Sequence, residues 1–222
     1  MWCIPPKENA EFVANMEDVL ETYTLPYDEK RPVVCIDESS KQLIGEIRTP
    51  IPIESGKPEK YDSEYVRNGV CNIFMSFEPL SGIRHVKVTD HRTSIDWALY
   101  IKEIVDVQYS QADKIVIVQD NLNTHTPASL YKAFNPKEAR RIINKLEFHY
   151  TPKHGSWLDM AEIELSVLSR QLPKRIPTKE ELQEKVAAWE KKRNNKVVKV
   201  NWQFTTNDAR IKLRKLYPVF DA

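Results

Sequence analysis

The sequence predicts an α/β protein built on a mixed β-sheet with helices around it, and three observations support this prediction. Short runs of β-branched residues recur along the chain, as expected for buried strands. The early runs follow one another through short connections, as antiparallel strands do. The later runs alternate with segments of helical periodicity, which is the order of parallel strands joined by helices. We therefore expect three antiparallel strands followed by parallel strands, in a sheet flanked by helices.

The first elements follow from local patterns. Apolar residues recur at intervals of three and four over residues 9–23, which predicts an amphipathic helix. Residues 31–37 (RPVVCID) form a β-branched run typical of a buried strand, and residues 41–48 predict a second, weaker strand. Residues 49–62 contain three prolines and one glycine, so we expect a loop or irregular arm there.

The rest of the chain alternates between patterns typical of strands and patterns typical of helices. Residues 68–78 and 82–90 predict two antiparallel strands joined by a tight turn. A helix is expected over 94–109, and a buried strand over 114–119. Beyond these we expect two short helices within 127–146, a strand at 146–151, a helix at 156–171 with Ser156 as its N-cap, and further helices at 179–194 and 208–217.

Composition excludes several classes of protein. The 222 residues are 41% hydrophobic and 29% charged, as in ordinary globular proteins. The five glycines lie too far apart for a dinucleotide fingerprint or a phosphate-binding loop, so we expect no nucleotide cofactor. Three widely spaced cysteines argue against a disulfide framework and fit a reducing cytoplasm. No apolar run reaches the roughly 18 residues of a membrane helix, so we expect no membrane partner.

Charge is balanced over the whole chain but not along it. The net charge is +1, yet from Arg170 onward fourteen Lys and Arg face only six Asp and Glu. The preceding part is acidic, including its first 30 residues. A basic final segment fits contact with nucleic acid, but charge alone favours this no more than a solvated helical face.

Carboxylates occur where a metal site could form. Asp37 and Asp120 end two predicted strands, at the edge where ligands bind in open α/β sheets. Two anions held close together favour a cation between them, and carboxylate oxygens suit Mg²⁺. The helix after the last strand carries Glu162 and Glu164 among apolar residues, and periodicity leaves both open as a third ligand. Alternatively, either aspartate is a turn or helix-cap residue.

Three segments resemble a known family. Residues 33–39 (VVCIDES), 117–127 (IVQDNLNTHTP) and 148–171 (FHYTPKHGSWLDMAEIELSVLSRQ) resemble the three blocks of a DDE transposase catalytic domain. They are most similar to the bacterial insertion-sequence branch of the mariner superfamily. The resemblance extends from MWCIPP at the start to FTTNDARIKLRKLYP near the end, so it covers nearly the whole chain.

This resemblance implies an RNase H-like fold with a two-metal site for DNA cleavage and strand transfer. The matching positions are Asp37, Asp120 and Glu162 as catalytic and metal-ligating acids, with Glu164 as the alternative third acid. It implies two Mg²⁺ ions, for which Mn²⁺ can substitute. Asp159 stands where the family usually has Asn, which is a mild departure.

Other polar residues near these acids are weaker candidates for binding nucleic acid. Asn121, Asn123 and His125 follow the second aspartate and are candidates for contact with the scissile strand or for orienting the metal ligands. Lys153 and His154 precede the acidic helix and are candidates for contact with phosphate. The alternatives are that the first three satisfy a loop backbone and that the last two lie in a solvated turn.

The resemblance also implies partners and an organisation of the chain. We expect double-stranded DNA partners (transposon ends and target), a homodimer in the active complex, and a cytoplasmic, nucleoid-associated protein. Residues 1–30 predict a helix-and-linker remnant, 31–172 the catalytic domain, and 173–222 a basic helical extension packed on it. The helix-turn-helix DNA reader usual in the family is expected to be missing. Two alternatives remain, another RNase H-like nuclease and a non-catalytic remnant that only binds nucleic acid or transposase subunits.

Overall fold

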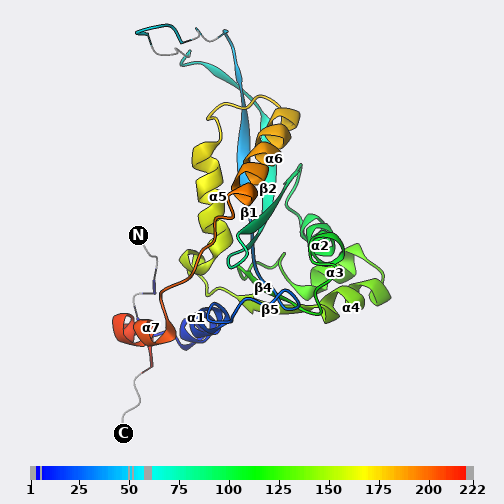
Figure 1. Ribbon diagram of the computed structural model, residues 1–222, viewed down its shortest axis with the longest axis vertical. Coiled ribbons are helices and arrows are strands. Elements are labelled where there is room, and N and C mark those ends of the chain that lie inside the picture. Colours follow the sequence, from blue (N-terminus) through cyan, green and yellow to red (C-terminus); the bar gives the residue numbers. More distant parts are fainter. Residues whose placement is uncertain (1–3, 6, 50, 52, 58–61, 219–222) are drawn as a thin grey trace.

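A mixed five-stranded sheet forms the centre of the computed structural model, which describes residues 4–5, 7–49, 51, 53–57 and 62–218 (Figure 1). The strands lie in the order β3-β2-β1-β4-β5. Their bounds are Val33–Glu46 (β1), Tyr65–Glu78 (β2), Ile83–Thr89 (β3), Ile115–Gln119 (β4) and Leu146–Tyr150 (β5). The first three strands are antiparallel, whereas β4 runs parallel to β1 and β5 parallel to β4. The predicted sheet is therefore confirmed.

The first strand corrects one expectation. Two strands were expected, at 31–37 and 41–48, but β1 is continuous across both. The polar residues between them remain in the ladder, since Ser39 pairs with Ile73 and Ser40 with Asn72 of β2. Backbone pairing does not require apolar side chains, so the polar stretch did not break the strand. Asp37 consequently lies inside β1 rather than at its end.

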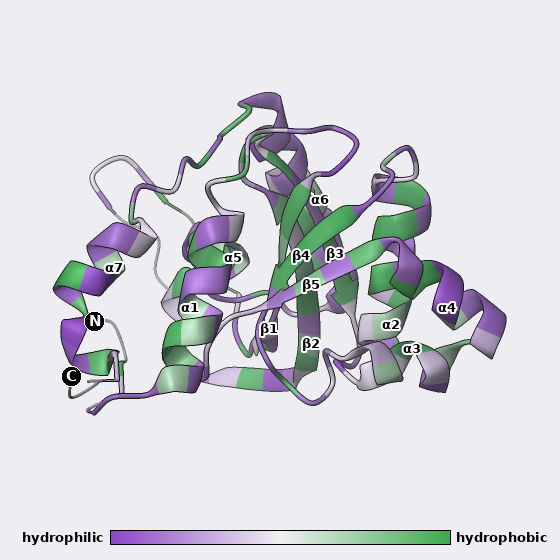
Figure 2. Cartoon of the chain, turned by 90° about the horizontal axis from the view of Figure 1, so that it is seen from below, coloured by the Kyte–Doolittle hydropathy of each residue, from purple (hydrophilic) through white to green (hydrophobic). Residues whose placement is uncertain are grey.

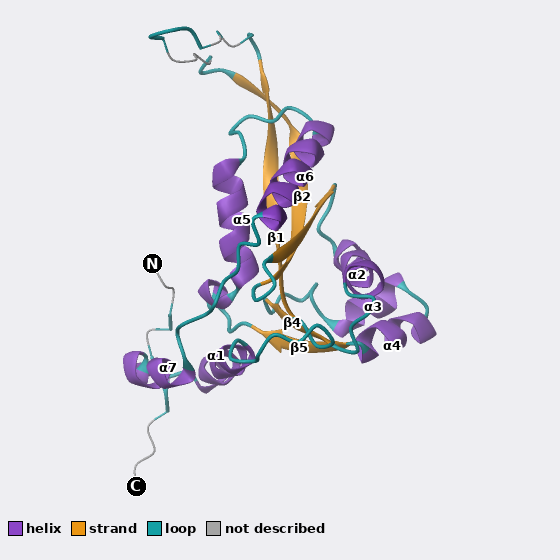
Figure 3. Ribbon diagram, in the orientation of Figure 1, coloured by secondary structure: helices purple, strands orange, loops and turns teal. Residues whose placement is uncertain are grey.

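The distal parts of β1 and β2 form a two-stranded arm that projects beyond the helices (Figure 3). A bulge interrupts the register between Gln42 and Ile44, and Gly69 opposite it has a φ of 108°, which glycine adopts without strain. The loop expected at 49–62 falls at the tip, and residues 50, 52 and 58–61 lie outside the described part. Several apolar side chains of the arm are exposed, namely Ile47, Ile51, Ile53, Tyr65, Val66 and Val70.

Three helices cover one face of the sheet. They are α2 (Ser94–Glu103), α3 (Pro127–Ala133) and α4 (Pro136–Asn144), and their apolar residues pack with Val34, Ile36 and Ile117 of the strands. The helix expected over 94–109 ends as an α-helix at Glu103 and continues as a π-helix over Ile104–Gln108. Figure 2 shows that the central strands are largely hydrophobic, whereas α4 is mostly hydrophilic.

The opposite face carries α1 (Ala10–Thr22), α5 (Met160–Gln171), α6 (Lys179–Asn195) and α7 (Thr206–Lys212). Short 3₁₀ turns at Ser156–Leu158 and Arg214–Leu216 precede α5 and follow α7. Buried residues of α1, at helical spacing, pack with Cys35, Val118 and Leu158, so the N-terminal helix is part of the core. Helices α5 and α6 cover β2 through a separate apolar cluster. None of the helices in the described ranges is long and apolar enough to cross a membrane.

Side-chain alternation along β1 determines which helices each residue faces. Val34 and Ile36 pack on the side of α2, whereas Cys35 packs on the side of α1 and α5. Asp37 therefore faces the same side as Cys35, and Glu38 faces the side of α2. The strand thus presents two adjacent carboxylates to opposite faces of the sheet.

Candidate active site

Asp37 and Asp120 are neighbours across the sheet. Ile36 of β1 is paired in parallel with Gln119, the last residue of β4, so the next residue of each chain segment is one of these aspartates. Parallel strands start from the same end, so this register brings together two residues that are 83 positions apart in the sequence. The main-chain N–H of Glu38 donates a 2.8 Å hydrogen bond to Asp37 Oδ1.

Glu162 reaches the same region from the first turn of α5. Asp37 and Glu162 both line a hollow of about 420 Å³, together with Ser39, Ser166, Ser169 and Arg170. Asp120 lines a second hollow of about 360 Å³, with Asn121, Lys153 and His154. The three predicted acids therefore lie around one part of the surface, with an open hollow on either side.

The surroundings of Asp37 disfavour its charged form. Burial, followed by the charges of Glu38, Asp120 and Glu162, raises the pKa of Asp37 from its ordinary 3.8 to about 7. A carboxyl group with a raised pKa lacks the cations that would stabilise its charge. Such a cluster favours binding of an external cation, and strongly perturbed carboxylates are typical of functional sites.

Asp159 is a fourth carboxylate in this cluster, which sequence analysis noted only as a departure from Asn. Its side chain is buried, and burial together with Asp37, Asp120 and Glu162 raises its pKa well above the ordinary range. One oxygen accepts a 2.8 Å hydrogen bond from the N–H of Ala161, whereas Oδ2 is buried without a hydrogen-bond partner. Asp159, and not Ser156 as expected, is the N-cap of α5. The sequence signal for this N-cap was an Asp directly before an apolar helix.

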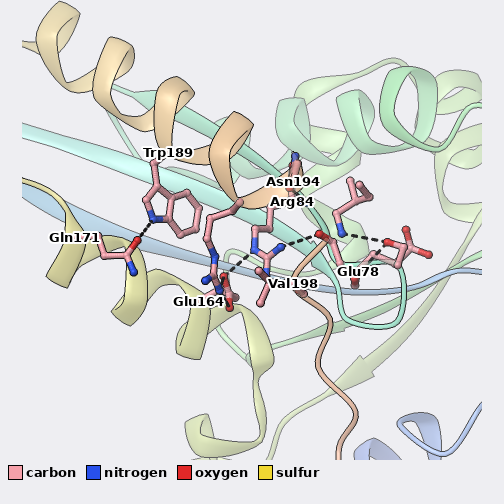
Figure 4. A network of polar contacts seen from close by, with 11 residues as sticks. Glu78, Arg84, Glu164, Gln171, Trp189, Asn194 and Val198 are labelled. Atoms are coloured by element: carbon pink, nitrogen blue, oxygen red, sulfur yellow. Dashed lines mark hydrogen bonds and ion pairs between the residues drawn. The ribbon is translucent and has the colours of Figure 1, made fainter. Parts of the chain in front are cut away.

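The structure separates the two candidate glutamates of α5. Glu164 is buried in an ion cluster, where Arg84 Nε and Arg193 Nη2 each lie 2.7 Å from its carboxylate oxygens. Figure 4 shows Arg84 of β3 between Glu164 and the main chain of Val198, to which it donates a 2.8 Å hydrogen bond. Glu164 thus faces β3 and α6, whereas Glu162 faces Asp37.

This ion cluster also holds α5 in place. Arg84 Nη1 donates to the carbonyl of Gly82 at 2.7 Å, and its guanidinium lies 4.4 Å from the centre of the Phe77 ring. Asn194 of α6 accepts from the N–H of Arg84 and donates to its carbonyl. The C-terminal segment therefore fixes the rotation of α5, and with it the direction of Glu162.

His125 differs from the expected surface contact, because its side chain is buried. One ring nitrogen hydrogen-bonds to Asp120 Oδ1, and the other lies 3.1 Å from Glu38 Oε2. Burial opposes the charged ring, but the adjacent carboxylates of Asp120 and Glu38 outweigh it and raise the pKa of His125 to about 9. The ring therefore cannot contact a DNA strand directly. Glu38 was not among the residues predicted from the sequence. What sets it apart from other glutamates is its contact with His125, which only the folded chain brings about.

The remaining polar candidates are exposed. Asn121, Lys153 and His154 are surface residues that line the hollow beside Asp120. His154 has a φ of 65°, in the left-handed region, within the turn that leads to α5. Asn123 is also exposed but lines neither of the two hollows described above. In the described ranges, no three His, Cys, Asp or Glu side chains are gathered closely enough to hold a metal ion.

Known transposase structures share this fold. The chain matches the mariner Mos1 paired end complex with Mg with a TM-score of 0.58 and 10% identity, over 99% of this chain and 66% of that chain. It matches the catalytic domain of Mos1 mariner transposase with a TM-score of 0.51 and 12% identity, over 88% and 96% of the two chains. The predicted RNase H-like fold, with its mixed sheet and flanking helices, is confirmed.

A third match, the Mos1 transposase paired-end complex with left transposon end, has a TM-score of 0.54 and 12% identity. It covers 88% of this chain but 64% of the Mos1 chain, so this chain spans less than two thirds of that protein. Among curated proteins, none matches the chain. A family model described as DDE superfamily endonuclease matches residues 32–183, which is more than half of the chain. The chain therefore belongs to the DDE superfamily endonucleases.

Proposed function

We propose that the chain is the catalytic domain of a DDE transposase from the bacterial insertion-sequence branch of the mariner superfamily. It cleaves DNA and transfers strands in transposition, with Asp37, Asp120 and Glu162 as the catalytic and metal-ligating acids. The observation that carries this proposal is geometric: the register of β1 and β4 brings Asp37 beside Asp120, and Asp37 lines the same hollow as Glu162 of α5. The ion pairs of Glu164 with two arginines inside the fold favour Glu162 over Glu164 in this role.

The donor set fits two Mg²⁺ ions, or Mn²⁺ in their place, because both ions prefer carboxylate oxygen. The raised pKa of Asp37 and the unpartnered buried oxygen of Asp159 are what such ions would offset. We propose that ion binding draws the three carboxylates together, since they are not gathered closely enough without it. In support, Mos1 paired end complexes are described with Mg and with Mn.

Different residues of the chain would bind the ions and the DNA. Bound divalent ions would activate a water or a DNA 3′-hydroxyl and stabilise the leaving oxygen. Asp37, Asp120 and Glu162 would hold these ions without forming a covalent intermediate. Arg170 in one hollow, and Lys153 with His154 in the other, would contact phosphates on either side of the scissile bond. The exposed Asn121 and Asn123 would contact the same strand.

Double-stranded DNA, as transposon ends and target, is the proposed partner, and a homodimer is the proposed active form. The projecting arm supports the homodimer, because its exposed apolar residues such as Ile53, 76% exposed, could be buried against a second copy. Light scattering of the chain with transposon-end DNA should show two copies per complex. Ile53→Asp should reduce assembly, and unchanged assembly by this variant would exclude the arm as the contact.

Nicking of supercoiled plasmid tests the activity most simply. The full chain should nick in the presence of Mg²⁺ or Mn²⁺, and Asp120→Ala and Glu162→Gln should not. A matched control is Glu184→Gln, which removes an exposed carboxylate from α6 and should leave nicking unchanged. Metal-independent nicking, or full nicking by Asp120→Ala, would reject the proposed role of these acids.

Joining of a precut DNA end separates transposition from the alternatives. A transposase should join the 3′ end to target DNA, whereas another RNase H-like nuclease would only cut. A non-catalytic remnant would do neither, while still binding DNA.

A further inference from the structure

His125 is buried between two carboxylates, although it belongs to the loop after β4. Its Nδ1 contacts Asp120 Oδ1 and its Nε2 lies 3.1 Å from Glu38 Oε2. The side chains of His125 and Glu38 are only 3% and 4% exposed, so water cannot readily replace either contact. Asp120 itself remains 32% exposed and lines the hollow, so it is still accessible to a ligand.

One face of the imidazole ring is also covered, in addition to the contacts at its nitrogens. Trp97 of α2 stacks on it, with ring centres 5.8 Å apart and planes inclined by 18°. Trp97 Nε1 donates to Gln119 Oε1 at 3.2 Å, and Gln119 Nε2 donates to the carbonyl of His125 at 2.8 Å. Trp97 and Gln119, both buried, therefore restrict the orientation of His125.

Glu38 connects this arrangement to the other proposed ligand. It is the residue after Asp37 on β1 and points to the opposite face, where α2 and Trp97 lie. A chain of contacts thus runs from β1 through Glu38 and His125 to Asp120. Through it, the loop carrying one proposed ligand is tied to the strand carrying the other.

We propose that Glu38 and His125 are positioning residues that hold the Asp120 carboxylate for ion binding. The ring engages one carboxylate oxygen from the buried side and orients the group toward the hollow. Ligating carboxylates are commonly held by a surrounding layer of hydrogen bonds, and loss of such a partner typically weakens metal binding about 10–100-fold. This inference rests on the proposed function, because it assumes that Asp120 ligates a divalent ion.

Two variants of the full chain test the inference. His125→Phe keeps a ring against Trp97 and removes the contacts with both carboxylates, and Glu38→Gln keeps the shape of Glu38 without its charge. The matched control is His149→Phe, because His149 also bridges two carboxylates, at 2.8 Å from Asp18 and 3.4 Å from Glu147. Titration calorimetry with Mn²⁺ alone measures the affinity, thermal unfolding measures the fold, and plasmid nicking is followed across Mg²⁺ concentrations.

We expect Mn²⁺ affinity to fall about 10–100-fold in His125→Phe and Glu38→Gln but not in His149→Phe. The Mg²⁺ concentration for half-maximal nicking should rise by a similar factor, with a smaller change in the maximal rate. A purely structural role would lower the unfolding temperature and leave the affinity of the folded fraction unchanged.

Wild-type Mn²⁺ affinity in folded His125→Phe or Glu38→Gln would overturn the inference. If His125→Phe does not fold, the Mn²⁺ affinity of Glu38→Gln alone tests the inference. The proposed function fails separately if the wild-type chain neither binds Mn²⁺ nor nicks DNA. If the wild type does both while the two variants retain its affinity, only the inference fails.

Discussion

Glu162 and Glu164 lie two residues apart on α5, yet their surroundings are opposite. Glu164 is enclosed by Arg84 and Arg193 and shares their hydrogen bonds inside the fold. Glu162 faces Asp37 and contributes to raising its pKa. The comparison teaches that a carboxylate neutralised within the fold and one beside like charges can stand two residues apart on one helix, and that the second is the better candidate for binding an external cation.

The largest expected effect comes from exchanging the two glutamates for glutamine. Glu164→Gln should lower the free energy of unfolding by about 3–5 kcal/mol, because it leaves the guanidinium of Arg84 buried without its counter-ion. Glu162→Gln should leave that free energy unchanged or raise it, and abolish nicking instead. Urea unfolding of both variants, side by side with the nicking assay, measures the two outcomes.

The same contrast can be sharpened by removing both charges. The double variant Arg84→Met with Glu164→Leu should recover part of the stability lost in Glu164→Gln, since apolar replacements leave no unpaired charge at these two positions. Equal losses in stability from Glu162→Gln and Glu164→Gln would show that the two sites do not differ as described.

An intermediate effect is expected from the pH dependence of Asp37. Because its pKa is about 7 in the folded chain and 3.8 ordinarily, the folded state binds this proton more tightly than the unfolded state. Its contribution to stability is therefore lost as pH rises from about 4 to about 7. Asp37→Asn should stabilise the chain at pH 8, because the amide stays neutral where the carboxylate of Asp37 ionises in a buried position beside other negative charges.

Urea unfolding at pH 5 and pH 8 measures this difference, and Mg²⁺ should stabilise the wild type more than Asp37→Asn at pH 8. Glu184→Gln serves as the exposed control and should show neither effect. Equal stability of Asp37→Asn and wild type at both pH values would mean that Asp37 carries no electrostatic cost.

The smallest expected effect concerns Arg170, which lines the hollow beside Glu162. If it contacts one phosphate, Arg170→Ala should weaken DNA binding and reduce the slope of log affinity against log salt by about one. Arg140→Ala, on α4 across the sheet, removes an exposed charge away from the site and should leave the slope unchanged. Fluorescence anisotropy across salt concentrations, with Ca²⁺ in place of Mg²⁺, provides the measurement.

Much of the fold was predictable because local patterns determine it. The apolar run of β4 and the apolar residues at helical spacing in α1 had to be buried in the core of any fold. Both elements could therefore be predicted without knowing which other elements they pack against. The prediction was wrong where polarity was taken as a break, at Ser39 and Ser40, since these residues stay in the ladder through their backbone. The N-cap of α5 was misplaced because a 3₁₀ turn intervenes before Asp159.

The site was predictable only in part, because its finer features depend on residues far away in sequence. Periodicity could not distinguish Glu162 from Glu164, since the decision comes from Arg84, 80 residues earlier, and Arg193, 29 residues later. The burial of His125 depends on Trp97 and Glu38, which come from other elements. The placement of Asp37, Asp120 and Glu162 as metal ligands remains a prediction.

The central claim is that these three acids converge on divalent ions, and anomalous diffraction from crystals of the chain grown with Mn²⁺ tests it most directly. We expect Mn²⁺ density in contact with the carboxylates of Asp37, Asp120 and Glu162, with Glu164 still bound to Arg84 and Arg193. Mn²⁺ ligated elsewhere, or by Glu164, with Asp37, Asp120 and Glu162 apart from any ion, would contradict it.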